Sequence, residues 1–136
     1  CGGAGNGQAA KICNNMILGA TMIVTAEAFV LGEKLGLTHQ ALFDVASTSS
    51  GQSWSLTTYC PAPGPVPTSP ANNGYKPGFA AALMLKDLKL SQEAAASAGA
   101  ATPMGAAAAQ IYALFNAAGH AGDDFSGVIN FLRGHG

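Results

Sequence analysis

The sequence carries little charge of either sign. Of its 136 residues, six are lysine or arginine and seven are aspartate or glutamate, so 10% are charged, against about 25% in an average soluble domain. With a net charge of −1 the chain offers no basic footprint for phosphate backbones, and we expect no nucleic-acid partner. The apolar share of 49% excludes an intrinsically disordered protein. So few charges indicate that another chain or domain covers part of the surface.

Paired cysteines and long apolar runs are also missing. Cys1, Cys13 and Cys60 are odd in number and form no Cys-x-x-Cys pair, so we expect neither a disulfide framework nor a metal site. Unpaired thiols fit a reducing compartment. The uncharged stretch between Lys11 and Glu27 is shorter than the roughly 20 apolar residues of a bilayer span, and we expect no membrane partner.

Helical patterns cover most of the chain. The spacing of Ile12, Met16, Ile23 and Val30 predicts one long helix over residues 8–35, which Gly36 ends. Turn and capping signals predict shorter helices, over residues 38–47, 53–59, 79–98, 102–118 and 123–132. Five prolines between residues 61 and 70 predict a long loop. Because no alternating strand pattern of useful length occurs, we predict one all-α domain over residues 1–136.

The glycine-rich start fits three kinds of structure. A P-loop needs lysine and a hydroxyl residue after its last glycine, but Gln8 follows Gly7, which excludes a P-loop. A dinucleotide fingerprint can be laid on Gly5, Gly7 and Ala10, but it needs a strand before it, and only residues 1–4 precede. The third possibility, a flexible entry into the long helix, is the one we favour.

Lys11 and Asn15 lie four residues apart, so they project from one face of a helix. If the helix begins just before Lys11, the positive end of its dipole disfavours the charged form of the amine. The Asn15 amide could then orient a substrate oxygen. On spacing alone, a solvated lysine and a surface asparagine are the better interpretation.

Other notable side chains favour structural roles. We expect Trp54 in the core or at a domain interface, and Cys13 as a buried, inert thiol. His39, His120 and His135 have no carboxylate or cysteine at ligand spacing, so we expect them at the surface or at helix ends.

The start of the chain also matches a known signature. Gly2, Gly5, Gly7, Lys11 and Asn15 occupy every defined position of G-x-x-G-x-G-x-x-x-K-x-x-x-N, and the run resembles the signature of the β-hydroxyacid dehydrogenase family. Further segments resemble the branch of that family that handles 3-hydroxyisobutyrate: Thr25–Ala28, Leu31–Gly32, Ser49–Gly51 with Trp54, Tyr59–Gly64, Tyr75–Phe79 and Lys86–Leu88. The resemblance extends from Gly2 to about Arg133.

The resemblance implies a two-domain oxidoreductase. This chain would be its helical C-terminal half, similar to the C-terminal domain of 6-phosphogluconate dehydrogenase, and would supply substrate contacts and the interface of a homodimer or tetramer. An N-terminal Rossmann domain that binds NAD would be missing from this chain. The reaction would transfer a hydride between 3-hydroxyisobutyrate and NAD to give methylmalonate semialdehyde, a step of valine catabolism, in a bacterial cytoplasm or the mitochondrial matrix.

By position in the motifs, the resemblance also implies roles for individual residues. Lys11 would be the general acid/base. The substrate contacts would be Asn15, Gly7 and Asp87, and the cofactor contacts Lys86 and Phe79. Two alternatives stay open: a related NADPH-linked reductase of tartronate semialdehyde, succinic semialdehyde or glyoxylate, and, for the chain alone, a non-catalytic dimerisation module.

Overall fold

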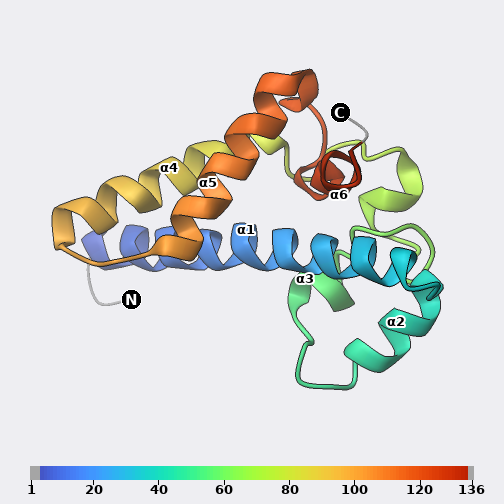
Figure 1. Cartoon of the computed structure of the whole chain (residues 1–136). Coiled ribbons are helices and arrows are strands. Elements are labelled where there is room, and N and C mark those ends of the chain that lie inside the picture. Colours follow the sequence, from blue (N-terminus) through green and yellow to red (C-terminus); the bar gives the residue numbers. More distant parts are fainter. Residues whose placement is uncertain (1–3, 135–136) are drawn as a thin grey trace.

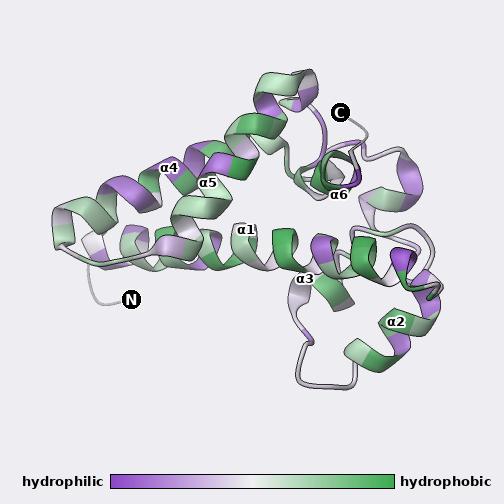
Figure 2. Ribbon diagram, in the orientation of Figure 1, coloured by the Kyte–Doolittle hydropathy of each residue, from purple (hydrophilic) through white to green (hydrophobic). Residues whose placement is uncertain are grey.

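One long helix, α1 (Ala4–Lys34), is the axis on which the other helices pack. Its 31 residues span about 46 Å at about 1.5 Å per residue. In the computed structural model α4 (Ala81–Ala98) and α5 (Pro103–Phe115) lie against the first half of α1. The second half contacts α2 (His39–Ala46) and α3 (Trp54–Thr57) on one side and α6 (Val128–Leu132) on the other (Figure 1). Figure 2 shows hydrophobic residues along most of α1 and hydrophilic residues on many turns of α4.

The structure describes residues 4–134, and within them no strand forms. The expected all-α class is therefore confirmed. After α1 follow α2 (His39–Ala46), α3 (Trp54–Thr57), the 3-10 turn η1 (Pro70–Asn73), α4 (Ala81–Ala98), α5 (Pro103–Phe115), the π turn η2 (Asn116–His120), the 3-10 turn η3 (Phe125–Gly127) and α6 (Val128–Leu132).

Two glycines let α4 and α5 approach α1 closely. A Cβ on Gly19 would lie 3.0 Å from the Leu88 side chain, and a Cβ on Gly105 would lie 2.5 Å from the Met16 sulfur. Larger residues at either position would push the helices apart. Along this seam the core forms from side chains that are buried to within a few per cent: Met22, Ala26, Phe29, Met84, Leu88, Tyr112, Phe115, Phe125 and Ile129.

The long helix begins earlier than predicted. It starts at Ala4 and runs through Gly5 and Gly7, so the expected flexible entry is wrong. Each added helical residue gains a backbone hydrogen bond, and a glycine penalty of about 1 kcal/mol does not end an established helix. Lys11 therefore lies about two turns inside α1, beyond the first turn on which the helix dipole acts, and the dipole argument does not apply to it.

Most of the predicted helix ends are confirmed. Thr38 accepts a hydrogen bond from the Ala41 amide at 3.0 Å, and Gly99 closes α4 with φ +71°. Thr102 was expected to cap α5 but makes no side-chain cap. Its hydroxyl instead donates to Gln92 Oε1 at 3.1 Å, which ties the start of α5 to α4.

By length and composition α1 could also cross a membrane, over Gly5–Lys34. The expectation that no segment meets this criterion is wrong, because the helix continues past the charges at its two ends. Core helices of soluble proteins meet the same criterion, and 39% of the most apolar window of α1 is buried against the rest of the chain.

A charged cluster ties the end of the chain to the far end of α1. Arg133 Nε donates to Glu33 Oε1 at 2.9 Å, and Arg133 Nη2 to Oε2 at 2.5 Å. His39 Nε2 lies 2.6 Å from Glu33 Oε2 and its Nδ1 3.1 Å from the Pro63 carbonyl. His39 begins α2 and so lies at a helix end, as expected, where this cluster partly buries it. The hydrogen bond from Arg133 is the main cause that lowers the pKa of Glu33 to about 2.

We predict that this cluster makes the free energy of unfolding decrease at acidic pH. Because the folded pKa of Glu33 lies below its ordinary value of 4.5, its contribution is full above about pH 4.5 and is lost as the pH falls towards 2. Glu33→Gln removes that dependence. The loss of unfolding free energy between pH 5 and pH 2 should be smaller in the variant, by only about 1–2 kcal/mol because the pair is partly exposed. Urea unfolding at several pH values measures it, with the exposed Glu27→Gln as control; equal losses in Glu33→Gln and the unchanged chain would contradict the prediction.

Candidate active site

A cavity of about 290 Å³ lies between the first half of α1 and the middle of α4. Its lining residues are Gln8, Lys11, Ile12 and Asn15 from α1, with Asp87 and Leu90 from α4. The four α1 residues recur at helical spacing, so they form one face. Three of the site residues expected from the sequence thus line one cavity, although Asp87 comes from another part of the chain.

Asn15 is held on both sides of its amide. Its Nδ2 donates to Asp87 Oδ2 at 2.8 Å, and its Oδ1 accepts from Asn14 Nδ2 at 3.1 Å. An amide has two N–H groups and two lone pairs on its oxygen, so one donor and one acceptor position remain for a ligand. Asp87 and Asn14 therefore orient the Asn15 amide without occupying all of its hydrogen-bonding positions.

Lys11 lies on the same face but is exposed in this chain. A lysine that transfers protons has to lose part of its water, since burial disfavours the ammonium form. The described residues leave this wall of the cavity open. A second surface is needed to close over the amine.

The other expected site residues lie outside this cavity. Gly7 is exposed, one turn before Lys11. Lys86 is exposed beside Lys89 in a separate hollow of about 330 Å³ on α4. Phe79 precedes α4 and is partly buried, with its ring edge-on to Phe125 at 5.5 Å. Gly2 of the signature lies outside the described residues.

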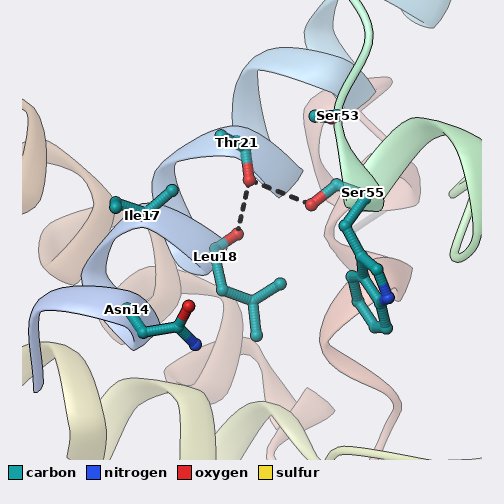
Figure 3. Close-up of a pocket in the computed structure, with 7 residues that line it drawn as sticks. Asn14, Ile17, Leu18, Thr21, Ser53 and Ser55 are labelled. Atoms are coloured by element: carbon teal, nitrogen blue, oxygen red, sulfur yellow. Dashed lines mark hydrogen bonds between the residues drawn. The ribbon is translucent and has the colours of Figure 1, made fainter. Parts of the chain in front are cut away.

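A second cavity, of about 410 Å³, lies further along α1 and shares no lining residue with the first. Its lining residues are Asn14, Ile17, Leu18, Thr21, Ser53, Trp54 and Ser55. Figure 3 shows the Thr21 hydroxyl between two partners: it donates to the Leu18 carbonyl at 3.2 Å and lies 2.9 Å from Ser55 Oγ. Asn14 belongs to this cavity and bonds to Asn15 of the first. Asn14 was not among the site residues expected from the sequence, although it forms a second face of α1 together with Ile17, Leu18 and Thr21.

The expectation that Cys13 is buried is wrong, whereas only one of the two places expected for Trp54 is excluded. Trp54 is 52% exposed, which excludes the core of this chain and leaves the domain interface as a prediction; one face of its indole stacks on Tyr59 with centroids 5.0 Å apart. Cys13 is exposed, because α1 turns Met22 and Phe29 inwards and leaves Cys13 outside. Cys60 is the buried thiol, and burial raises its pKa to about 11.

The remaining polar groups form structural pairs. His120 stacks on Phe115 with ring centroids 4.8 Å apart, and its Nδ1 lies 2.8 Å from Asp123 Oδ2. His135 lies outside the described residues. Within residues 4–134 no group of three histidine, cysteine or carboxylate side chains could hold a metal ion.

Comparison with known proteins identifies the family. A family model described as NAD-binding of NADP-dependent 3-hydroxyisobutyrate dehydrogenase matches residues 5–132. The chain belongs to this family. It is 61% identical over 133 residues to a probable 3-hydroxyisobutyrate dehydrogenase of Mycobacterium tuberculosis, covering 98% of this chain and 45% of that protein. It is 48% identical to the mitochondrial 3-hydroxyisobutyrate dehydrogenase of Homo sapiens, covering 98% of this chain and 40% of that protein.

Solved structures of this family have the same helical fold. A structure of the Mycobacterium tuberculosis 3-hydroxyisobutyrate dehydrogenase with L-serine superposes with a TM-score of 0.94 at 61% identity, over 98% of this chain and 45% of that one. A Salmonella typhimurium 3-hydroxyisobutyrate dehydrogenase, 24% identical, matches in fold with a TM-score of 0.79 over 90% of this chain and 41% of that one. The chain therefore spans less than half the length of these relatives.

A double-mutant cycle can measure the coupling energy of the hydrogen bond between Asn15 and Asp87. We expect Asn15→Ala and Asp87→Ala each to destabilise the chain, and the double variant to cost less than their sum. A coupling energy of about 1 kcal/mol is expected, because the bond involves a carboxylate and is only partly buried. Urea unfolding of all four proteins gives the coupling. Lys34, at the far end of α1, and Asp87 serve as the control cycle, because they lie too far apart to couple; additive effects for Asn15 and Asp87 would contradict the bond.

Proposed function

We propose that this chain is the helical C-terminal half of an NAD(P)-dependent dehydrogenase that oxidises 3-hydroxyisobutyrate, or a closely similar β-hydroxy acid, with Lys11 as general acid/base. The supporting observation is the cavity in which Lys11, the oriented amide of Asn15 and Asp87 meet. Membership of the family supplies the reaction class. Since the relatives are more than twice as long, the preceding part of such an enzyme is the natural source of the Rossmann domain.

The residues of the cavity divide the work on the substrate. Lys11, as the free amine, accepts the proton of the substrate hydroxyl, and as the ammonium returns it in the reverse reaction. Asn15 offers its remaining N–H to an oxygen of the substrate, and Asp87 keeps that N–H pointed into the cavity. Gly7, one turn before Lys11, lies outside the cavity, and its proposed substrate contact rests on its place in the signature.

The cofactor needs residues from both halves. NAD(P), when bound, takes up the hydride from the carbon that carries the hydroxyl. In this chain Lys86 and Phe79 are the residues proposed to hold it: an exposed ammonium suits a phosphate or a carboxamide, and an aromatic ring suits a flat base. No strand followed by a glycine-rich turn occurs in the part of the chain that the structure describes, so the pyrophosphate has to be held by the other half.

The substrate class follows from what the relatives handle. L-Serine is present in the mycobacterial structure. Both L-serine and 3-hydroxyisobutyrate are acids with a hydroxymethyl group and one small substituent on the neighbouring carbon. Assays of 3-hydroxyisobutyrate and serine with NAD and NADP, and of tartronate semialdehyde, succinic semialdehyde and glyoxylate with NADH and NADPH, separate the proposed function from the related reductases. Two free thiols, at Cys13 and Cys60, fit the cytoplasm or the mitochondrial matrix.

We predict that Lys11→Ala in the full-length protein lowers kcat for 3-hydroxyisobutyrate by roughly 10²–10⁴-fold, because it removes the group that moves the proton. Cofactor affinity should stay unchanged, as measured by quenching of cofactor fluorescence. Lys34→Ala, at the exposed far end of α1, is the matched control. A loss of less than about tenfold with cofactor still bound would disprove the role of Lys11. The 136-residue chain alone should reduce no cofactor.

We also propose that α1 pairs with a second copy of the chain. Ile17, Val24 and Leu31 recur every seven residues and are 59%, 56% and 59% exposed. Their spacing places them on one face of the helix, away from the side that packs on α4 and α5. A continuous apolar row of this kind is typical of a surface that another chain covers, and the resemblance of the chain to the dehydrogenases implies an interface in this domain.

The pairing predicts the mass of the chain in solution. Light scattering should give about twice the 13.5 kDa of one chain. Val24→Asp buries a carboxylate in the proposed interface and should shift the chain to monomer at the same concentration. Leu114→Asp, on α5 at 58% exposure, should leave the mass unchanged. A monomeric unchanged chain, or an unaffected Val24→Asp variant, would rule out this interface.

A further inference from the structure

Asp124 is a fully buried carboxylate outside the cavity residues. It accepts five hydrogen bonds: from the Tyr59 hydroxyl at 2.6 Å, the Gly78 amide at 2.9 Å, the Phe79 amide at 3.0 Å, and the Ser126 amide and hydroxyl at 3.0 and 2.5 Å. Every one of these donors is neutral, and no cation among residues 4–134 forms an ion pair with Asp124. A buried charge is costly unless its lone pairs are filled, and here they are.

One oxygen of Asp124 joins two distant segments. Oδ1 accepts from Tyr59, which follows α3, and from Gly78 and Phe79, which precede α4. Gly78 has to be glycine for this contact, because a Cβ there would lie 2.6 Å from the Tyr59 hydroxyl. Burial and the neighbouring carboxylate raise the pKa of Tyr59, so its hydroxyl remains a donor. Asp124 thus provides the acceptor, Tyr59 the donor, and Gly78 the space beside the Tyr59 hydroxyl.

The bonds of Asp124 hold a row of four aromatic rings. Trp54 stacks on Tyr59 with centroids 5.0 Å apart, Tyr59 packs on Phe125 at 5.3 Å, and Phe125 meets Phe79 edge-on at 5.5 Å. Phe125 is buried, whereas Trp54 is half exposed and lines the 410 Å³ cavity. The Phe79 backbone is held at both ends, since its carbonyl accepts from the Phe125 amide at 2.8 Å. The two outer rings can therefore shift only if the inner contacts change.

We propose that Asp124 is a positioning residue of the active site. By holding Tyr59 and the Phe79 backbone, it fixes the rings of Trp54 and Phe79 as a preorganised apolar surface beside the bound substrate and cofactor. Asp124 itself touches neither. The kinetic part of this inference rests on the proposed function, whereas the ordering of the rings does not. A carboxylate is required because it only accepts; an amide at this position would point N–H groups at donors.

The ordering of the rings can be measured on the 136-residue chain. Trp54 is its one tryptophan, so tryptophan fluorescence reports the stack directly. Tyr59→Phe keeps the ring and removes only the hydroxyl, and Asp124→Asn keeps the size of the side chain. Both should raise the acrylamide quenching constant of Trp54 by about twofold or more. Asp123→Asn, at the adjacent exposed carboxylate, is the matched control and should leave quenching unchanged.

The kinetic role is measured in the full-length protein. Tyr59→Phe and Asp124→Asn should raise KM for 3-hydroxyisobutyrate or NAD(P) by about threefold or more, while the pH profile of kcat stays that of the unchanged enzyme. A purely structural role would reduce the fraction of active enzyme, and so the apparent kcat, without moving KM.

Each outcome decides one question. If Asp124→Asn does not fold, Tyr59→Phe carries the test, because it deletes a single bond. Unchanged quenching together with unchanged KM in folded Tyr59→Phe would overturn the positioning role. If the full-length protein oxidises no hydroxy acid, the proposed function fails, and the quenching of Trp54 still confirms or refutes the ordering by Asp124.

Discussion

The contact between α1 and α4 is the constraint on which the rest of the structure depends. The two helices run antiparallel (Figure 1), and Asn15 bonds to Asp87 while Gly19, one turn later on α1, reaches back to Met84 on α4. Gly19 sets how close they come. That distance brings a carboxylate of α4 within 2.8 Å of an amide of α1, so the packing of the core and the geometry of the cavity are set by the same contact.

The cavity between these two helices is open to solvent on one side. Lys11 is exposed, Lys86 lines a neighbouring hollow on α4 and the ring of Trp54 is half exposed. An exposed lysine is well solvated and costs the fold little, but the half-exposed ring of Trp54 suits a surface that a second domain covers. Apolar residues such as Ile17 and Val24 are also more than half exposed, and such a surface accords with the low charge of the sequence.

Features that depend on neighbours in sequence were predictable. The helical spacing from Ile12 to Val30, the cap at Thr38 and the glycine after α4 all act within a few residues, and the structure confirms them. The signature around Lys11 and Asn15 led to the right family. The start of α1 was missed because helix elongation outweighs local glycine propensity. The exposure of Cys13 and the network of Asp124 were missed because they depend on residues far away in the chain.

The clamp between Glu33 and Arg133 joins residues 100 positions apart. During synthesis the far end of α1 emerges from the ribosome 100 residues before its partner Arg133. Until Arg133 has emerged, the second half of α1 has neither this clamp nor the cover of α6. A long apolar helix therefore stays open to chaperones while those 100 residues are made.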